Sequence, residues 1–196
     1  MRTDAQRHSM PKDRTPATVI YNGPSREQWR DYSFPGYVLG CNYAYRDFSL
    51  THCWAVDRMT VAHIRGELER KPLPCEFWTR ESVLELPPDW QHRPTPGIDS
   101  GSAAIAHALD LTTAEVIVIG ADGVLGGSND TAYTFPWHPA GPTAKTHRRH
   151  SEYILTLQQR NERILIVSDI ENPQFKTISK LQALDLFNKY TANEGL

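Results

Sequence analysis

The strongest constraint on the fold of this chain is the repeated alternation of short apolar runs with stretches of helical periodicity. The runs are rich in β-branched and aromatic residues, and they predict strands at residues 18–21, 37–41, 53–56, 76–79, 115–120 and 164–168. The intervening patterns predict helices at 59–70, 102–111, 150–160 and 179–187. Strands that alternate with helices form parallel sheets covered on both faces. We therefore expect an α/β fold, a single-domain Rossmann-like and mostly parallel sheet with helices on both faces.

The length of 196 residues suits one domain. Residues 1–16 are polar and aperiodic, so we expect a disordered tail followed by a single nucleotide-binding α/β domain over 17–196. No apolar run approaches the roughly 20 residues needed to cross a bilayer, and the first residues lack the apolar core of a secretory signal. The sequence therefore predicts a cytoplasmic protein with no membrane partner.

Charge and cysteine content exclude several function classes. The formal net charge of −2 gives no general attraction to nucleic acid. The three cysteines form no C-x-x-C pair, which argues against a disulfide framework and against a zinc site. Neither the P-loop pattern nor the G-x-G-x-x-G dinucleotide pattern is present. We therefore look for function at the ends of the predicted strands.

Polar residues follow each of the first three predicted strands. Asn22, Gly23 and Ser25 follow the first strand, Asn42 follows the second, and Asp57 follows the third. Ligands of open α/β sheets bind at the carboxyl ends of the strands, where a glycine lets the backbone approach a phosphate or ribose. Ser25 and Gln28 have the spacing of a capping box, which would open a short helix that favours an anion. Each of these groups taken alone is equally consistent with a simple turn.

Two further segments extend this edge. Ser100, Gly101 and Ser102 open the alanine-rich helix and would either cap it or offer its N-terminus to an anion or sugar. The buried strand over 115–120 is followed by Asp122, which would bind a hydroxyl, a base or Mg²⁺, or would only form a turn.

A basic segment, Lys-Thr-His-Arg-Arg-His at residues 145–150, lies at a predicted helix start. Positive charge there is unfavourable for the helix dipole, which suggests an anionic ligand. His147 or His150 would suit a general base that takes a proton from an acceptor hydroxyl. The two histidines are a weak metal pair, because no cysteine or carboxylate completes the set nearby. The alternative is a solvated basic turn.

Four short motifs, taken in their order along the chain, resemble the motifs of one superfamily. They are Asn22-Gly23-Pro24-Ser25, Cys41-Asn42, Ser100-Gly101-Ser102 and Gly120-Ala121-Asp122. It contains the single-domain, Rossmann-like bacterial sialyltransferases and the 6-hydroxymethylpterin diphosphokinase-like proteins. The chain is also similar to compact phage-encoded members of this group. The resemblance covers residues 18–168.

The resemblance to the sialyltransferases implies a metal-independent glycosyltransferase that uses a CMP-sugar donor, a hydroxyl acceptor and a histidine base. It implies that the nucleotide and its phosphate are bound by Asn22, Gly23, Ser25, Asn42, Ser100, Gly101 and Ser102. Tyr133 matches a tyrosine that stabilises the leaving phosphate, with Arg148 beside it. His147 matches the base by position, with His150 as the second choice.

Two alternatives remain open at this point. A diphosphokinase-like enzyme would use ATP and Mg²⁺, with Asp122 or Asp57 as the metal ligand. A non-catalytic nucleotide-binding or phage assembly protein would keep the fold without the chemistry. The acceptor would bind on the long loops over 86–99 and 122–146 or on another subunit of a homo-oligomer. We expect Trp90 and Trp137 to be exposed on these loops, where they would form an acceptor platform or a subunit interface, or would only cover the edge of the sheet.

Overall fold

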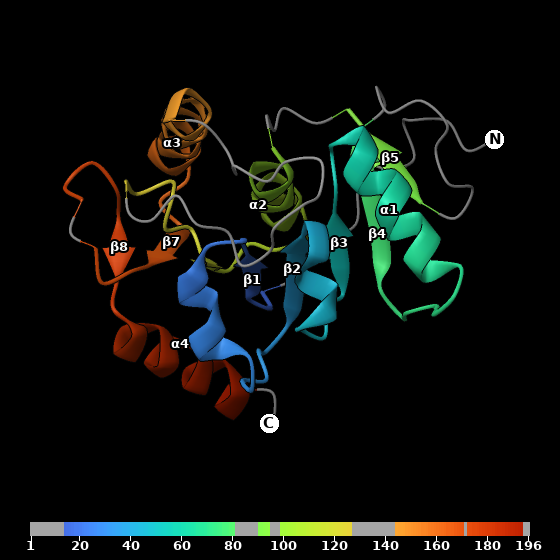
Figure 1. Cartoon of the computed structure of the whole chain (residues 1–196). Helices are drawn as coiled ribbons and strands as arrows, with labels where there is room; N and C mark the ends of the chain where they lie inside the picture. The colour runs from blue at the N-terminus through green and yellow to red at the C-terminus, as the bar shows by residue number, and fades with distance from the viewer. Residues whose placement is uncertain (1–13, 81–89, 95–98, 127–143, 171, 194–196) are drawn as a thin grey trace.

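The structure is a computed structural model, which describes residues 14–80, 90–94, 99–126, 144–170 and 172–193 (Figure 1). The strands are β1 (Ala17–Ile20), β2 (Tyr37–Cys41), β3 (His52–Trp54), β4 (Glu76–Arg80), β5 (Gln91–Arg93), β6 (Val116–Ile119), β7 (Ile164–Val167) and β8 (Thr177–Ile178). The α-helices are α1 (Arg58–Leu68), α2 (Ser100–Leu111), α3 (Ala144–Arg160) and α4 (Lys180–Asn193), and the 3₁₀ helices are η2 (Pro24–Trp29) and η3 (Asn42–Arg46).

All strands pair in parallel, in the order β5-β4-β3-β2-β1-β6-β7-β8. The chain adds strands in one direction from β1 to β5, then returns to the other side of β1 with β6 and continues outward. The strand order therefore reverses between β1 and β6. This place is the topological switch point of the sheet, where ligands of open α/β sheets bind. The predicted α/β fold with a parallel sheet is confirmed, and so are the six predicted strands and four predicted helices.

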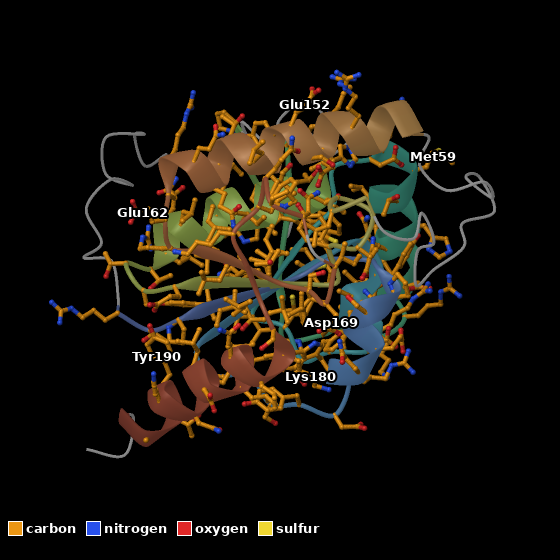
Figure 2. All side chains as sticks on the ribbon, turned by 90° about the vertical axis from the view of Figure 1, so that its left-hand side faces the viewer. Met59, Glu152, Glu162, Asp169, Lys180 and Tyr190 are labelled. Carbon is orange, nitrogen blue, oxygen red and sulfur yellow. The ribbon has the colours of Figure 1, made fainter. Side chains whose placement is uncertain are left out.

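Helices cover both faces of the sheet, and each face has its own core. Figure 2 shows α2 and α3 on one side of the strands and α4 on the other. The first core includes Val19, Val118, Ala104 and Ile154. The second core includes Ile20, Trp29, Ile64 and Phe187. Both β1 and β6 are buried along their whole length, which explains why neither shows an alternation of apolar and exposed polar residues.

Helix α2 is the most buried helix of the described chain, and it positions the candidate site. Ala103, Ala104 and Ala108 are buried almost completely, and the helix contacts β1, β2, β3, β6 and α3. Small side chains let the helix pack closely between the sheet and α3. The N-terminus of α2 therefore has a fixed position at the carboxyl edge of the sheet.

Residues 14–16, the end of the predicted tail, belong to the described structure. Pro16 is buried, and its carbonyl accepts from the backbone N–H of Tyr37 at 3.0 Å. The rest of the predicted tail, apart from residues 14–16, lies outside the described residues. Within the described ranges, no helix is both long enough and apolar enough to span a membrane.

The long loop over 86–99 contains an element that the sequence did not predict. β5 extends the sheet there, and Trp90, directly before it, is only 5% exposed and stacks on Phe77 with ring centroids 5.1 Å apart. The expectation that Trp90 is exposed is wrong. The ring covers the core beside β4, which agrees with the third of the expected roles, a cover for the edge of the sheet. Trp137 lies outside the described residues.

Candidate functional site

The turns that follow β1 and β6 meet at the point where the strand order reverses. The N–H of Gly23 donates to the carbonyl of Gly120 at 2.7 Å, and the N–H of Ser25 donates to Oδ2 of Asp122 at 3.1 Å. Three of the predicted site residues, Gly23, Ser25 and Asp122, are thus brought together from segments nearly 100 residues apart.

Gly23 is required by contacts within the protein. A Cβ atom at this position would lie 2.1 Å from Oδ2 of Asp122 and 2.4 Å from the carbonyl oxygen of Gly120. Gly120 itself has φ of +71°, a conformation that L-residues avoid. The sequence predicted that glycine lets the backbone approach a ligand, but the groups that approach Gly23 are Asp122 and Gly120.

The predicted capping box of Ser25 and Gln28 is wrong. η2 has Gly23 as its N-cap residue, and no side chain caps it. The N–H of Ser25 is instead bound by the carboxylate of Asp122, which comes from the turn after β6. The anion that we expected at this turn is thus supplied by the protein.

A buried arginine that the sequence did not single out orients Asn22. Arg26 is fully buried, pairs with Asp47 at 2.8 Å and donates from Nη1 to the carbonyl of Tyr21. The same nitrogen donates to Oδ1 of Asn22 at 3.2 Å. Because arginine has only donors, the amide oxygen of Asn22 must face it. The NH₂ group of Asn22 is then directed away from Arg26.

Asn42 is held in a similar way beside it. Asn22 and Asn42 each lie two residues beyond the paired residues Ile20 and Gly40 of neighbouring strands. Asn42 has φ of +53°, which asparagine tolerates better than most residues. Its Oδ1 accepts from the Ser100 hydroxyl at 2.9 Å, so the NH₂ group of Asn42 is also directed elsewhere.

Ser100 and Ser102 have different roles at the start of α2. Ser100 Oγ accepts from the N–H of Val56 at 3.1 Å, so it links the end of β3 to Asn42. The N-cap residue is Asp99, whose Oδ1 accepts from the N–H of Ser102 at 2.8 Å, and the Ser102 hydroxyl completes a capping box. The prediction that serines cap this helix is thus confirmed for Ser102, while Asp99 is the principal cap.

Asp99 also contributes to a cluster of titratable groups beneath α3. Its Oδ2 lies 3.6 Å from Nδ1 of His150. The ring of Tyr21 packs so closely on Gly101 that a Cβ there would lie 2.1 Å from it. Burial, and secondarily the charge of Asp99, raises the pKa of Tyr21 well above its usual value. The pKa of Tyr153 is raised for the same two reasons.

The predicted catalytic residues are only partly brought together. The contact of His150 with Asp99 places His150 at this edge. The side chain of His147 and the whole of Tyr133 lie outside the described residues. Arg148 is 82% exposed and pairs with Glu152 at 2.9 Å. Figure 2 shows Glu152 on the outer side of α3, so Arg148 shares that outer side.

The two candidate magnesium ligands differ in their engagement. Asp57 is the N-cap of α1, and its Oδ1 accepts from the N–H of Thr60 at 3.0 Å. Asp122 lies at the switch point, with Oδ2 bound by Ser25. No group of three or more histidine, cysteine or carboxylate side chains suited to a metal is found among the described residues. Magnesium in phosphate-transfer sites typically needs only one or two carboxylates plus substrate phosphates. Of the two aspartates, Asp122 is the one that follows β6, where the strand order reverses.

Comparison with known proteins found no matching family model, no matching curated protein and no matching solved structure.

Proposed function

We propose that the chain is a transferase that binds a nucleotide-activated donor at the carboxyl edge of β1 and β2. The donor that we favour is a CMP-sugar, and the acceptor is a hydroxyl group. The reaction is that of a metal-independent, sialyltransferase-like glycosyltransferase. The observation that carries this proposal is the matched orientation of Asn22 and Asn42 at adjacent strand ends.

The two amide groups define what the edge can recognise. Both carbonyl oxygens are engaged inside the protein, by Arg26 and by Ser100, so each side chain has N–H donors left for a ligand. A pair of fixed donors favours a ligand rich in acceptors, such as the carbonyl and ring nitrogen of a cytosine, a ribose or a phosphate. The ends of β1 and β2 lie next to the reversal of strand order between β1 and β6, where ligands of open α/β sheets bind.

His150 supplies the base in this scheme. The acceptor hydroxyl gives its proton to the imidazole, and the acceptor oxygen forms a bond to the anomeric carbon of the donor sugar. The bond from that carbon to the phosphate oxygen breaks, and its electron pair leaves with the nucleotide phosphate. His150 is favoured over His147 because its ring has a described carboxylate neighbour, Asp99.

A thermal-shift panel of CMP, CMP-sugars, UDP-sugars and ATP, each with and without Mg²⁺, tests the proposal. We expect CMP or a CMP-sugar to raise the melting temperature in the absence of metal, since a ligand at 100 times its Kd stabilises by about 2.7 kcal/mol. The absence of stabilisation by every cytidine nucleotide would contradict the proposal.

Two substitutions sharpen this panel. Asn22→Asp and Asn42→Asp keep the oxygens that accept from Arg26 and Ser100 but replace the NH₂ donors with a charged acceptor. We expect that cytidine nucleotides no longer raise the melting temperature of either variant. Asn188→Asp, an exposed position on α4, makes the same charge change and should keep it. An equal rise in melting temperature in all three variants would show that Asn22 and Asn42 do not bind the nucleotide.

A diphosphotransferase that uses ATP and Mg²⁺ is the second candidate, and Asp122 favours it. A carboxylate at the switch point repels a bare phosphate and attracts a metal-bound one. Under this candidate, ATP stabilises the chain only with Mg²⁺, and Asp122→Asn abolishes the effect. Stabilisation by ATP that is indifferent to Mg²⁺ would exclude it.

A further inference from the structure

The carboxylate of Asp99 is held in place by the capping box at the start of α2. Its Oδ1 accepts from the N–H of Ser102 at 2.8 Å, and the Ser102 hydroxyl lies 3.2 Å from the N–H of Asp99. This capping box belongs to α2, which is buried along most of its length. The side chain of Asp99 is itself only 15% exposed. Its second oxygen, Oδ2, therefore has a fixed position.

That second oxygen faces one particular nitrogen of His150. Oδ2 lies 3.6 Å from Nδ1, a separation within ion-pair reach but longer than a hydrogen bond. Contacts of catalytic groups are often long before the substrate binds and then shorten. Because a carboxylate only accepts hydrogen bonds, it favours the imidazole tautomer with its proton on Nδ1. The lone pair is then on Nε2.

The hydroxyl of Tyr21 is a second buried polar group close to the start of α2. Both this hydroxyl and Oδ2 of Asp99 are buried, and neither has a hydrogen-bond partner among the described residues. Burial, and after it the charge of Asp99, raises the pKa of Tyr21, so the phenol stays protonated. The Tyr21 ring packs on Gly101, two residues after Asp99 in the chain. A protonated phenol can donate to Oδ2 of Asp99.

We infer that Asp99, supported by the Tyr21 hydroxyl, is a positioning residue that sets the tautomer of His150 and makes Nε2 the atom that accepts the proton. The catalytic use of this arrangement rests on the proposed function, whereas the tautomer is a property of the free protein. Asp99 does not take the proton. It fixes the ring and stabilises the positive charge that the ring acquires.

Nitrogen-15 NMR of the histidine rings tests this inference on the full chain without any nucleotide. Neutral His150 should have its proton on Nδ1 in the unaltered protein. In Asp99→Asn the cap to Ser102 remains possible, because asparagine is an equally good N-cap residue. Its NH₂ group can then face His150, and we expect the proton to move to Nε2. The same tautomer in both proteins would overturn the inference.

Two further variants keep the test decisive if Asp99→Asn folds poorly. Tyr21→Phe removes a donor to Asp99, so Oδ2 becomes a stronger acceptor for the ring, and the Nδ1 proton resonance should move further downfield. An unchanged resonance would remove Tyr21 from the arrangement. Glu76→Gln alters the carboxylate 3.6 Å from His52 and should leave His150 unchanged. A tautomer change at His150 in this control would mean that the signal is not local to Asp99.

The NMR test of His150 and the nucleotide-binding test of the proposed function can succeed or fail independently. If the tautomer follows Asp99 but no cytidine nucleotide binds, the positioning role stands and the proposed donor is wrong. If CMP binds and the tautomer ignores Asp99, the donor site stands and the positioning role is wrong.

Discussion

Two histidine–carboxylate pairs lie at opposite edges of the same sheet, and each has a nitrogen–oxygen separation of 3.6 Å. At the carboxyl edge, Asp99 is 15% exposed and capped into α2, while His150 is 21% exposed. At the amino edge, Glu76 is 63% exposed and His52 only 12% exposed. The first pair has a fixed carboxylate beside a ring that solvent can reach. The second has a loose carboxylate beside a ring that is largely covered.

The ring of His52 is also surrounded by other aromatic rings. His52 packs against the ring of His107 with centroids 4.9 Å apart, and His107 in turn accepts from the indole N–H of Trp54 at 3.0 Å. Burial lowers the pKa of His52 below its usual 6.5, and the charge of Glu76 opposes this shift only in part. Equal distances therefore do not imply equal roles. His52 is packed among other rings, whereas His150 lies beside a fixed carboxylate and is partly open to solvent.

The largest expected effect separates the two histidines by activity. His150→Gln should lower the rate of CMP release from the stabilising CMP-sugar by about 10²-fold or more, because a general base contributes that much. His52→Gln should leave the rate unchanged. A larger loss of rate in His52→Gln than in His150→Gln would contradict the different roles of the two histidines. A larger loss in His147→Gln than in His150→Gln would move the base to the position that the sequence favours first.

The second effect is on stability at the carboxyl edge. Gly101→Ala forces a Cβ to within 2.1 Å of the Tyr21 ring, and we expect a loss of about 1–3 kcal/mol in the free energy of unfolding. Gly66→Ala is the matched control, because its nearest neighbour would be 3.9 Å away and the position lies within α1. This change should stabilise by about 0.5–1 kcal/mol. Urea denaturation of both variants measures the difference, and equal effects would contradict the close packing of Tyr21 on α2.

The third effect is a pH dependence that belongs to the amino edge. Since the pKa of His52 is lower in the folded state than in the unfolded chain, the unfolded chain takes up a proton first as the pH falls through about 6.5. Stability is therefore lost as the pH falls, with a slope of at most about 1.4 kcal/mol per pH unit for one proton. His52→Gln should reduce this slope. A slope that is unchanged in His52→Gln would show that this ring is not buried as described.

The smallest effect concerns Arg148. Its pair with Glu152 is exposed, and an i,i+4 pair of this kind is worth about 0.3–0.5 kcal/mol. Arg148→Ala should therefore change the unfolding free energy by no more than this and should leave CMP binding intact. Loss of CMP binding in this variant would place the guanidinium in the site, as the sequence predicted.

The sequence predicted the sheet and its helices because their signals are local. Apolar runs such as residues 115–120 and the spacing of three and four over 59–70 specify strand and helix without reference to distant residues. β5 was missed because Gln-His-Arg has no apolar alternation and lies at the edge of the sheet. The turn residues were found for a similar reason, since they directly follow recognisable strands.

The interior of the site could not be predicted in this way, because it depends on long-range contacts. Arg26 is buried by an ion pair with Asp47, and the Gly101–Tyr21 contact joins residues 80 positions apart; neither pattern is visible in a linear sequence. Asp99 is a different case. Aspartate is a preferred N-cap residue and Asp99 directly precedes the predicted serines, so its role was recognisable in the sequence, although we expected the serines to cap the helix.

We propose that Asn22 and Asn42 bind a nucleotide at the carboxyl edge of β1 and β2. The most direct test is a CMP titration followed by NMR of the asparagine side-chain NH₂ signals and the tryptophan indole signals. We expect the NH₂ signals of Asn22 and Asn42 to shift and saturate together, while the indole signals of Trp54 and Trp78 beside His107 stay unchanged. Shifts confined to the tryptophans, or no saturable shift at either asparagine, would contradict the account.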